Sequence, residues 1–403
     1  MSGAQEGAPL GDGTGAAFPR DANDANDAND ANDANGAAFP RDAAGASGAA
    51  ASPGDVLVRL RRDDAAWDAF VAASPYGFHT QLSAWATVKA ANGWRAVRVV
   101  ADGGSGPIGA QVLVRSVGPS PFAVGYAPRG PVATTWDAAS LEAFGASLRR
   151  TARRLRLTHV TVEPPLEGEE GRALFADSGW RTADDVQPRR TREVPLDRSE
   201  AELWGDLRSK WRQYVQKARR TGVVVTEGGR DDLETFYAIF IDTARRTGFI
   251  PRTIDSYRAV WDAFAPSGTA RLLFGRLPGG EAVATLFLLR CGRRMVEPYG
   301  GMTPDGAESR ANYLLKWEAI RQSAEGGAAV YDMWGLAHAG IEQFKVGFGG
   351  REANYVGAFD LVTLPLLRDV LVGGRRVWVR VARRAYAARH GTGTVASLPA
   401  DTT

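Results

Sequence analysis

The chain has 403 residues, of which 44% are hydrophobic, 24% are charged and one, Cys291, is a cysteine. This length predicts two folded domains, and a lone cysteine excludes a disulfide framework and a thiolate metal cluster. The sequence has no apolar run of about 18 residues and no charged-then-apolar leader, so we expect a folded protein of the cytoplasm.

Charge is divided unevenly along the chain. Residues 1–50 hold eight acids and two bases, a net charge of −6, so the +3 of the whole chain leaves +9 on residues 51–403. Such a basic folded part favours a polyanion such as RNA, or an anionic membrane face. An arginine-rich surface with no partner is the alternative.

Two stretches are expected to be disordered. Residues 1–53 contain the triplet Asp-Ala-Asn five times over positions 21–35. Such a tract cannot bury enough apolar surface to offset an ordering entropy of ~1–2 kcal/mol per residue. Residues 391–403 form the second stretch. We assign no function to the repeat.

Residues 54–198 are expected to form a first α/β domain. Short helices are predicted at Trp67–Ala73 and Leu82–Ala91, and a longer helix at Leu141–Leu157 carries an apolar stripe opposite five arginines. A further helix and strand lead to about Pro195. Strands are predicted at Arg95–Val100, Ile108–Ser116, Phe122–Tyr126 and His159–Glu163.

Residues 199–366 repeat this order of elements without a clear sequence repeat. Helices are predicted at Glu200–Thr221, Leu233–Thr247 and Arg310–Ala324, and the first two are followed by glycines. The arrangement predicts a second α/β domain. Its strands are predicted at Val223–Glu227, Arg271–Leu277, Ala282–Arg290, Arg293–Tyr299 and Ala329–Trp334.

Residues 367–390 are expected to hold a separate basic helix, Gly374–Arg389, with six arginines and no acid. Its charge would let it contact the anionic inner face of a membrane, as a peripheral interaction. Its small apolar face, made of Val377, Trp378 and Val381, makes it a weak anchor alone.

Common catalytic constellations are missing. The histidines at 79, 159, 338 and 390 have no metal-ligand spacing, so no metal is expected, and no nucleophile motif surrounds a serine. No phosphate loop or dinucleotide fingerprint is present. The Gly-rich turn with which acetyl-CoA-dependent transferases hold pyrophosphate is also missing. The layout therefore indicates an acyltransferase without the usual acyl carrier, and we expect no cofactor.

The most informative stretch is Val330–Gly357, VYDMWGLAHAGIEQFKVGFGGREANYVG. Phe344 and Lys345 stand just ahead of glycines that let the backbone turn sharply and approach a ligand. The Lys345 ammonium could then stabilise the oxyanion that forms when an amine attacks an ester. A solvated lysine beside a tight turn is the alternative.

This stretch resembles the C-terminal signature of the FemABX family, peptidyltransferases that lengthen peptidoglycan side chains with amino acids from aminoacyl-tRNA. Other segments are similar to family segments and occur in the same order, so the resemblance covers about residues 56–370. They are LSAWATVK at 82–89, GYAPRGPV at 125–132, LRSKWRQYVQKARRTGVVV at 207–225, GFIPR at 248–252 and EPYGG at 297–301.

The resemblance implies two tandem domains of the acyl-CoA N-acyltransferase (GNAT) type, with the precursor in a cleft. Arg252 would hold a precursor phosphate, because a guanidinium fork suits one. Lys345, positioned by Phe344, would favour the transition state, and the substrate's own phosphate is thought to assist proton transfer. Tyr126, Tyr257 and Tyr299 would hydrogen-bond the precursor, and Trp85 and Lys89 would border its sugar or pyrophosphate. Surface or core packing is the alternative for each.

One departure concerns the tRNA. Some relatives carry a long antiparallel coiled coil in the second domain, whereas here the basic helix runs straight into a strand without heptads. The tRNA would then be held by phosphate contacts from the basic helix, unless that helix face is merely solvated. The candidates are Arg208, Lys210, Arg212, Lys217, Arg219 and Arg220.

The leading hypothesis is therefore an aminoacyltransferase that moves glycine or alanine from aminoacyl-tRNA to the side-chain amine of a peptidoglycan precursor. The acceptor would be lipid II or UDP-MurNAc-pentapeptide. A tRNA-dependent enzyme acting on a secondary metabolite is one alternative. A non-catalytic RNA- or membrane-binding module of the same fold is the other.

Overall fold

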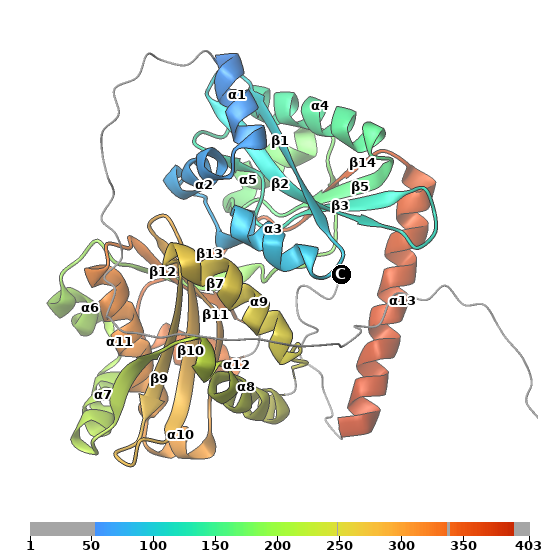
Figure 1. Cartoon of the computed structure of the whole chain (residues 1–403). Helices are drawn as coiled ribbons and strands as arrows, with labels where there is room; N and C mark the ends of the chain where they lie inside the picture. The colour runs from blue at the N-terminus through green and yellow to red at the C-terminus, as the bar shows by residue number, and fades with distance from the viewer. Residues whose placement is uncertain (1–52, 248, 337–338, 391–403) are drawn as a thin grey trace, which may run out of the picture.

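The computed structural model describes residues 53–247, 249–336 and 339–390, so the expected tails at 1–53 and 391–403 lie outside the described residues, except for Pro53 at the start of a helix. Two mixed sheets, one above the other in Figure 1, form the centres of two α/β units. Among the described residues, no helix is long and apolar enough to cross a membrane.

The first sheet has the order β1-β2-β3-β5-β14-β6, with β4 paired to β2. Helix α4 (Ala138–Arg154) covers it, and the predicted stripe is buried at Leu141, Phe144 and Leu148. The helices of this unit are α1 (Pro53–Arg62), α2 (Asp64–Ala73), α3 (Ser83–Ala90), α4 and α5 (Gly168–Asp177). The strands are β1 (Arg95–Asp102), β2 (Pro107–Ser116), β3 (Ala123–Ala127), β4 (Val132–Ala133), β5 (Leu157–Val162), β6 (Arg181–Thr182) and β14 (Phe359–Val362).

The second sheet has the order β13-β7-β12-β11-β10-β9-β8. Its helices are α6 (Glu200–Asp206), α7 (Ser209–Arg220), α8 (Leu233–Thr247), α9 (Ile254–Phe264), α10 (Pro304–Glu308), α11 (Ala311–Glu325) and α12 (Ala339–Val346). Its strands are β7 (Arg190–Pro195), β8 (Val224–Gly228), β9 (Ala270–Arg276), β10 (Ala282–Cys291), β11 (Arg294–Met302), β12 (Val330–Gly335) and β13 (Arg351–Asn354).

The two units share one plan. In each, three antiparallel strands lead through a long helix to a strand that pairs in parallel with the third: β3 with β5, and β11 with β12. This confirms the expected pair of GNAT-like domains. Helix α7 passes through Gly222 directly into β8, so the chain has no coiled-coil insertion at this point.

The two sheets also exchange strands. β7 precedes the second unit's helices but pairs with β12 and β13, and β14 follows that unit but pairs with β5 and β6 of the first sheet. The expected division of the chain at residues 198 and 366 therefore stays a proposal.

Three large hydrophobic cores among the described residues hold this arrangement together. One lies between α4 and the first sheet, and one lies between the second sheet and helices α7 and α11. The third joins α2 and α3 of the first unit to α8, α9 and β10 of the second. Burial of aromatic and aliphatic side chains across this junction favours a fixed relation between the units.

Several predicted elements need correction. The expected helix Glu200–Thr221 is two helices, because Leu207 adopts an extended conformation and buries its side chain. Gly205, two residues before Leu207, is the local sequence signal for this break. Helices α9 and α12 were not predicted.

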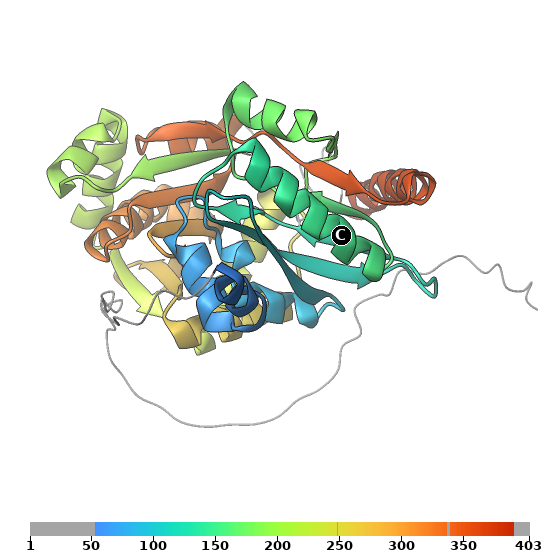
Figure 2. The ribbon, with the colours of Figure 1, turned by 90° about the horizontal axis from the view of Figure 1, so that it is seen from above.

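The last helix, α13 (Pro365–His390), begins earlier than expected and passes through Gly373 and Gly374. Seen from above, α13 lies at the opposite end of the molecule from α6 and α7 (Figure 2).

Candidate active site

A cluster of tyrosines and cations lies where the two units meet. The Arg252 backbone N–H donates to the Tyr257 hydroxyl at 3.3 Å, and the Tyr237 hydroxyl donates to the Arg252 carbonyl at 3.0 Å. The rings of Tyr257 and Tyr299 meet edge to face with centroids 5.1 Å apart. We call Arg252, Tyr237, Tyr257, Tyr299 and Lys89 the Arg252 cluster.

The first unit contributes Lys89 to this cluster, from α3. Its side chain is buried and its ammonium lies 5.2 Å from the centre of the Trp85 ring. Burial lowers the pKa of Lys89 well below its usual value, and the nearby positive charges of Arg252 and Arg115 lower it further. Burial raises the pKa of Tyr299, whereas Arg252 opposes that rise. The half-buried Arg252 thus stands close to the buried Lys89 and to the neutral phenol of Tyr299, which suits an anionic group.

A β-bulge in β11 divides two chemical environments. The register between β10 and β11 shifts between the pairs Phe287–Tyr299 and Leu289–Val296. Tyr299 therefore faces α8 and α9, whereas Glu297 faces α11 and is paired there with Lys316, both side chains being buried. β11 and β12 pair only as far as Val296 and Asp332, so the two strands separate beyond the bulge.

Lys345 lies at the end of β12, where that strand has separated from β11. Its Nζ donates to the carbonyl oxygens of Met333 at 2.6 Å, Trp334 at 2.9 Å and Gly335 at 2.7 Å. An ammonium has three donors, so all three are used. Trp334 is held at φ 58°, which helps bring these carbonyls together.

Burial lowers the pKa of Lys345 to about 8, with Lys316 also lowering it and Glu297 and Asp332 opposing. The amine is therefore charged at neutral pH but close to its titration point. We call Lys345 and its three carbonyl partners the Lys345 cluster.

Phe344 helps to form a pocket of 230 Å³ beside this cluster. Its ring contacts Tyr313 and Phe348, and its carbonyl accepts a hydrogen bond from the Trp211 indole at 3.0 Å. The pocket combines aromatic faces with one cation and is lined by Lys210, Trp211, Tyr214, Tyr313, Gly340, Gln343 and Phe344.

The glycines after Lys345 allow close packing against protein. A Cβ at Gly347 would lie 2.3 Å from the Trp211 ring, and one at Gly350, where φ is 73°, would lie 2.1 Å from the Glu193 carbonyl oxygen. Gly347 also accepts a hydrogen bond from the Arg208 N–H at 2.9 Å. Gly347 therefore joins the end of α12 to the break between α6 and α7, and Gly350 packs against β7, whereas the sequence suggested approach to a ligand.

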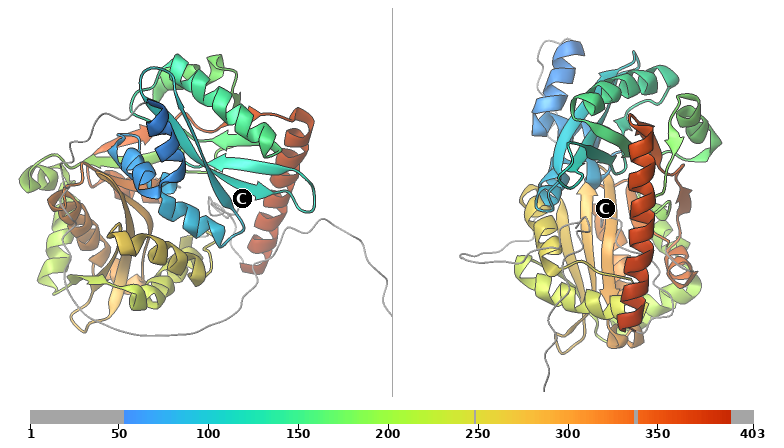
Figure 3. Two further views of the ribbon diagram at one scale, coloured as in Figure 1. Left: turned by 45° about the horizontal axis from the view of Figure 1, so that its top comes forward. Right: turned by 90° about the vertical axis from the view of Figure 1, so that its right-hand side faces the viewer.

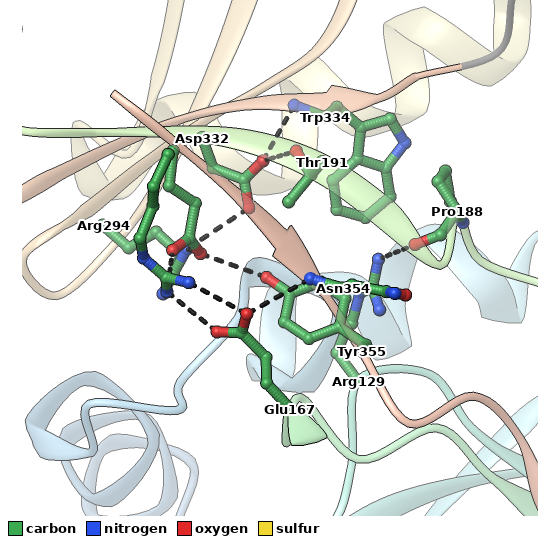
Figure 4. A network of polar contacts seen from close by, with 11 residues as sticks. Arg129, Glu167, Pro188, Thr191, Arg294, Asp332, Trp334, Asn354 and Tyr355 are labelled. Atoms are coloured by element: carbon green, nitrogen blue, oxygen red, sulfur yellow. Dashed lines mark hydrogen bonds and ion pairs between the residues drawn. The ribbon is translucent and has the colours of Figure 1, made fainter. Parts of the chain in front are cut away.

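A buried polar network fixes the junction on the other side of β12 (Figure 4). Arg129 of the first unit has its guanidinium 4.3 Å from the Tyr355 ring and 5.2 Å from the Trp334 ring, and donates to the Pro188 carbonyl. Arg294 of β11 pairs with Glu193 at 2.7 Å and with Asp332 at 3.2 Å. Trp334 thus links the network to the Lys345 cluster.

The structure brings some predicted site residues together and separates others. Arg252, Tyr257, Tyr299, Trp85 and Lys89 share the junction. Lys345 and Phe344 belong to a second group, whose described contacts include none of those five.

Tyr126 lies apart from both groups. It is buried in the first unit, where its hydroxyl donates to Glu163 and accepts from the Gln187 side-chain amide at 2.9 Å. Its contact with a precursor stays a prediction.

The six expected tRNA contacts lie on or beside α7 and differ in how strongly they are engaged. Arg212 donates to the carbonyls of Gly205 and Leu207, and Arg219 pairs with Glu318. Arg208 lies over Trp211 and Lys210 over Tyr214. Lys217 and Arg220 are exposed and form no ion pair with any described residue.

The buried pair of Glu297 and Lys316 and the Arg294 network were missed from the sequence. A signal existed, because Lys316 interrupts an apolar face in ANYLLKWEAI and Glu297 interrupts an apolar strand in RMVEPYGG. A charged residue at a core-facing position is rarely buried unless it is paired.

Taken together, two GNAT-type sheets, a parallel strand pair that separates beside a bulge, and a lysine at that separation define an acyltransferase. Residues 63–171 match the FemAB family, and residues 205–346 match the acetyltransferase (GNAT) domain. The fold is also similar to a crystal structure of FemX, with a TM-score of 0.69 and 22% identity over 76% of this chain and 97% of that chain.

Sequence relatives agree with the family match. The lipid II:glycine glycyltransferase of Staphylococcus haemolyticus (strain JCSC1435) is 24% identical over 73% of this chain and 90% of its own length. The protein of the same name from Staphylococcus aureus (strain MRSA252) is 31% identical, and that match spans 54% of each chain. The chain is thus similar to the FemAB family over residues 63–171, and it is an enzyme of the acyltransferase class.

Proposed function

We propose that this enzyme transfers glycine from glycyl-tRNA to the side-chain amine of a peptidoglycan precursor pentapeptide. The relatives named above are lipid II:glycine glycyltransferases, which supports glycine as the amino acid and a lipid-linked precursor as the acceptor. Transfer from tRNA, rather than from acyl-CoA, is the part of the proposal that rests on the family resemblance and on the missing pyrophosphate turn.

The observation that supports the acceptor assignment is the pair of neighbouring cations at the junction, the buried Lys89 and the half-buried Arg252. Burial lowers the pKa of Lys89 from the first unit, and the positive charge of Arg252 from the second unit lowers it further by repulsion. A precursor phosphate between them would neutralise that repulsion, and the hydroxyls of Tyr257 and Tyr299 lie beside it as hydrogen-bond donors. The precursor would thereby contact both units at once.

We place the aminoacyl donor, the charged tRNA, on the opposite side of the β11 bulge from Arg252. The aromatic pocket at Phe344 has faces on which a terminal nucleobase can stack, and Lys210 lies at its wall for a phosphate. The exposed Lys217 and Arg220 on the same helix would extend this contact along the RNA backbone. The ester carbonyl would then lie where β11 and β12 separate.

The chemistry requires one bond to form and one to break. The precursor amine attacks the ester carbonyl carbon, a C–N bond forms, the C–O bond to the ribose breaks, and the amine proton passes to the ribose oxygen. Lys345 supplies a fixed positive charge beside the developing oxyanion. Because its three donors bind protein carbonyls, it acts in this conformation through its charge rather than as a direct hydrogen-bond donor.

The direct test is a transfer assay. The protein is incubated with tRNAs charged with glycine, alanine or serine and with lipid II or UDP-MurNAc-pentapeptide, and the acceptor is weighed by mass spectrometry. The expected product carries one added glycine and depends on the charged tRNA. Addition from glycyl-CoA without tRNA would refute the donor assignment, and no addition to either precursor would refute the acceptor.

A further inference from the structure

Helix α13 displays its apolar side chains to solvent. Among the described residues, seven large hydrophobic side chains are exposed, and five of them lie on this one helix. Leu366 is 84% exposed and Val370 70%, and Val377, Trp378 and Val381 are between 43% and 58% exposed. A helix on the surface of a globular protein normally turns its apolar stripe inward, so this arrangement calls for a covering partner.

The exposed residues form a continuous stripe. Leu366, Val370, Val377 and Val381 recur at helical spacing, so they line one face, and Trp378 stands next to it. Gly373 and Gly374 fill the position between Val370 and Val377, where no side chain interrupts the face. We call these five side chains the outer stripe.

The inner face of α13 is held to the first unit by ion pairs. Arg368 pairs with Asp360 of β14 at 2.6 Å, and Arg376 pairs with Asp184 at 2.7 Å. The helix is therefore presented by the fold in a set orientation. Figure 3 shows it running as a rod along the flank of the molecule, past both units.

Positive charge borders the outer stripe. Arg380 and Arg384 are exposed and form no ion pair with any described residue, and Asp369 is the single acid between positions 365 and 384. A flat anionic surface with an apolar interior would satisfy both features, because the stripe enters the acyl boundary while the guanidinium groups meet headgroup phosphates.

We propose that α13 lies on an anionic lipid bilayer through its outer stripe. A second copy of the chain is a poorer occupant, because pairing two stripes would bring Arg380 and Arg384 of both copies together. RNA is poorer still, because it would leave the aliphatic stripe exposed. The inference adds to the proposed function a site at which the enzyme meets a lipid-linked acceptor, but the binding itself requires no catalysis.

The test measures co-sedimentation of the full chain with vesicles of phosphatidylcholine alone or of phosphatidylcholine and phosphatidylglycerol in equal parts. We expect binding to the anionic vesicles only, weakened by salt. The triple variant Val370→Glu, Val377→Glu, Val381→Glu should lose at least about tenfold in affinity. The double variant Val58→Glu, Val224→Glu is the matched control, because both valines are similarly exposed on other elements, and it should bind as the wild type does.

A second arm separates charge from apolar insertion. Arg380→Glu with Arg384→Glu should weaken binding to the anionic vesicles. Equal binding by the wild type and the triple variant would overturn the proposal. So would a wild-type chain that ignores vesicles and forms dimers that the triple variant abolishes, measured by analytical ultracentrifugation.

The activity arm keeps this proposal distinct from the proposed function. The triple variant should transfer glycine normally to a water-soluble, nucleotide-linked acceptor and slowly to the same pentapeptide on vesicle-embedded lipid II. If neither acceptor is modified by the wild type, the proposed function fails while the vesicle binding still decides the membrane inference.

Discussion

The Arg252 cluster and the Lys345 cluster lie on either side of one bulge in β11, yet their electrostatics differ. In the Arg252 cluster, Arg252 stands near the buried Lys89 and near the neutral phenol of Tyr299, so an anion from outside would reduce the repulsion between the two cations. In the Lys345 cluster, the single cation is saturated by three carbonyls of its own chain. The first arrangement suits binding of a substrate, and the second suits a charge that must stay in place.

The largest expected effect is at Lys345. Lys345→Met should reduce transfer by roughly 10²–10³-fold, as for the loss of a group that stabilises an oxyanion. It should also lower the melting temperature, because three buried carbonyls lose their partner. Single-turnover transfer and thermal unfolding measure the two effects. Arg153→Met on the exposed face of α4 is the control, and unchanged turnover in Lys345→Met would remove this residue from the mechanism.

A change at Arg252 should separate binding from chemistry. Arg252→Ala should raise the KM for the precursor by roughly tenfold to a hundredfold, the loss expected for a charged hydrogen bond, and leave kcat nearly unchanged. Arg258→Ala on α9, where the arginine pairs with Glu234 and Asp255, serves as the control. An unaltered KM would show that the phosphate binds elsewhere.

The rigidity attributed to the Lys345 cluster can be tested without touching a charge. Gly347→Ala places a methyl group against the Trp211 ring and should cost about 1–3 kcal/mol of unfolding free energy. Gly205→Ala in α6, where nothing lies within 4 Å, should be neutral or stabilising by about 0.5–1 kcal/mol. Chemical denaturation measures the unfolding free energy of both variants. Equal values would show that the loop at Gly347 can shift to accept the methyl group, which would contradict a rigid site.

The smallest expected effect is a pH dependence. Lys345 titrates at about 8, so kcat should fall by half near that pH and further above it. The unfolded chain keeps this proton up to about pH 10.4, so between these values the unfolded state binds more protons and this group's contribution to stability rises with pH. Loss of rate at pH 9 should therefore be reversible and occur without unfolding. A rate that climbs through pH 9 would contradict a charged Lys345.

Much of the fold could be predicted because the relevant signals are local. The stripe of α4 and the apolar runs of β10 and β11 are periodic over many residues, so burial of one face determines the element. The break between α6 and α7 was missed because Gly205, two residues before the extended Leu207, was not interpreted as the end of a helix. The glycines at 347 and 350 were identified, but the surfaces they approach belong to segments far away in the sequence.

The site was predicted in its residue types more than in its connections. Lys345 and Arg252 were found through motifs. The three carbonyls of the Lys345 cluster, however, are brought together by the conformation of Trp334, which no local sequence pattern predicts. Tyr126 also belongs to a motif, but its hydroxyl forms hydrogen bonds with Glu163 and Gln187 of the first unit.

The exchange of β7 and β14 has a consequence for biosynthesis. The first sheet lacks β14 until every strand of the second sheet has been synthesised, since β14 follows β13 in the chain. The first unit therefore cannot complete its sheet before the second unit has been synthesised. If the chain were divided between the two units, neither part would contain all the strands of its own sheet. To produce the first unit alone, the segment that contains β14 would have to be fused to it by a linker.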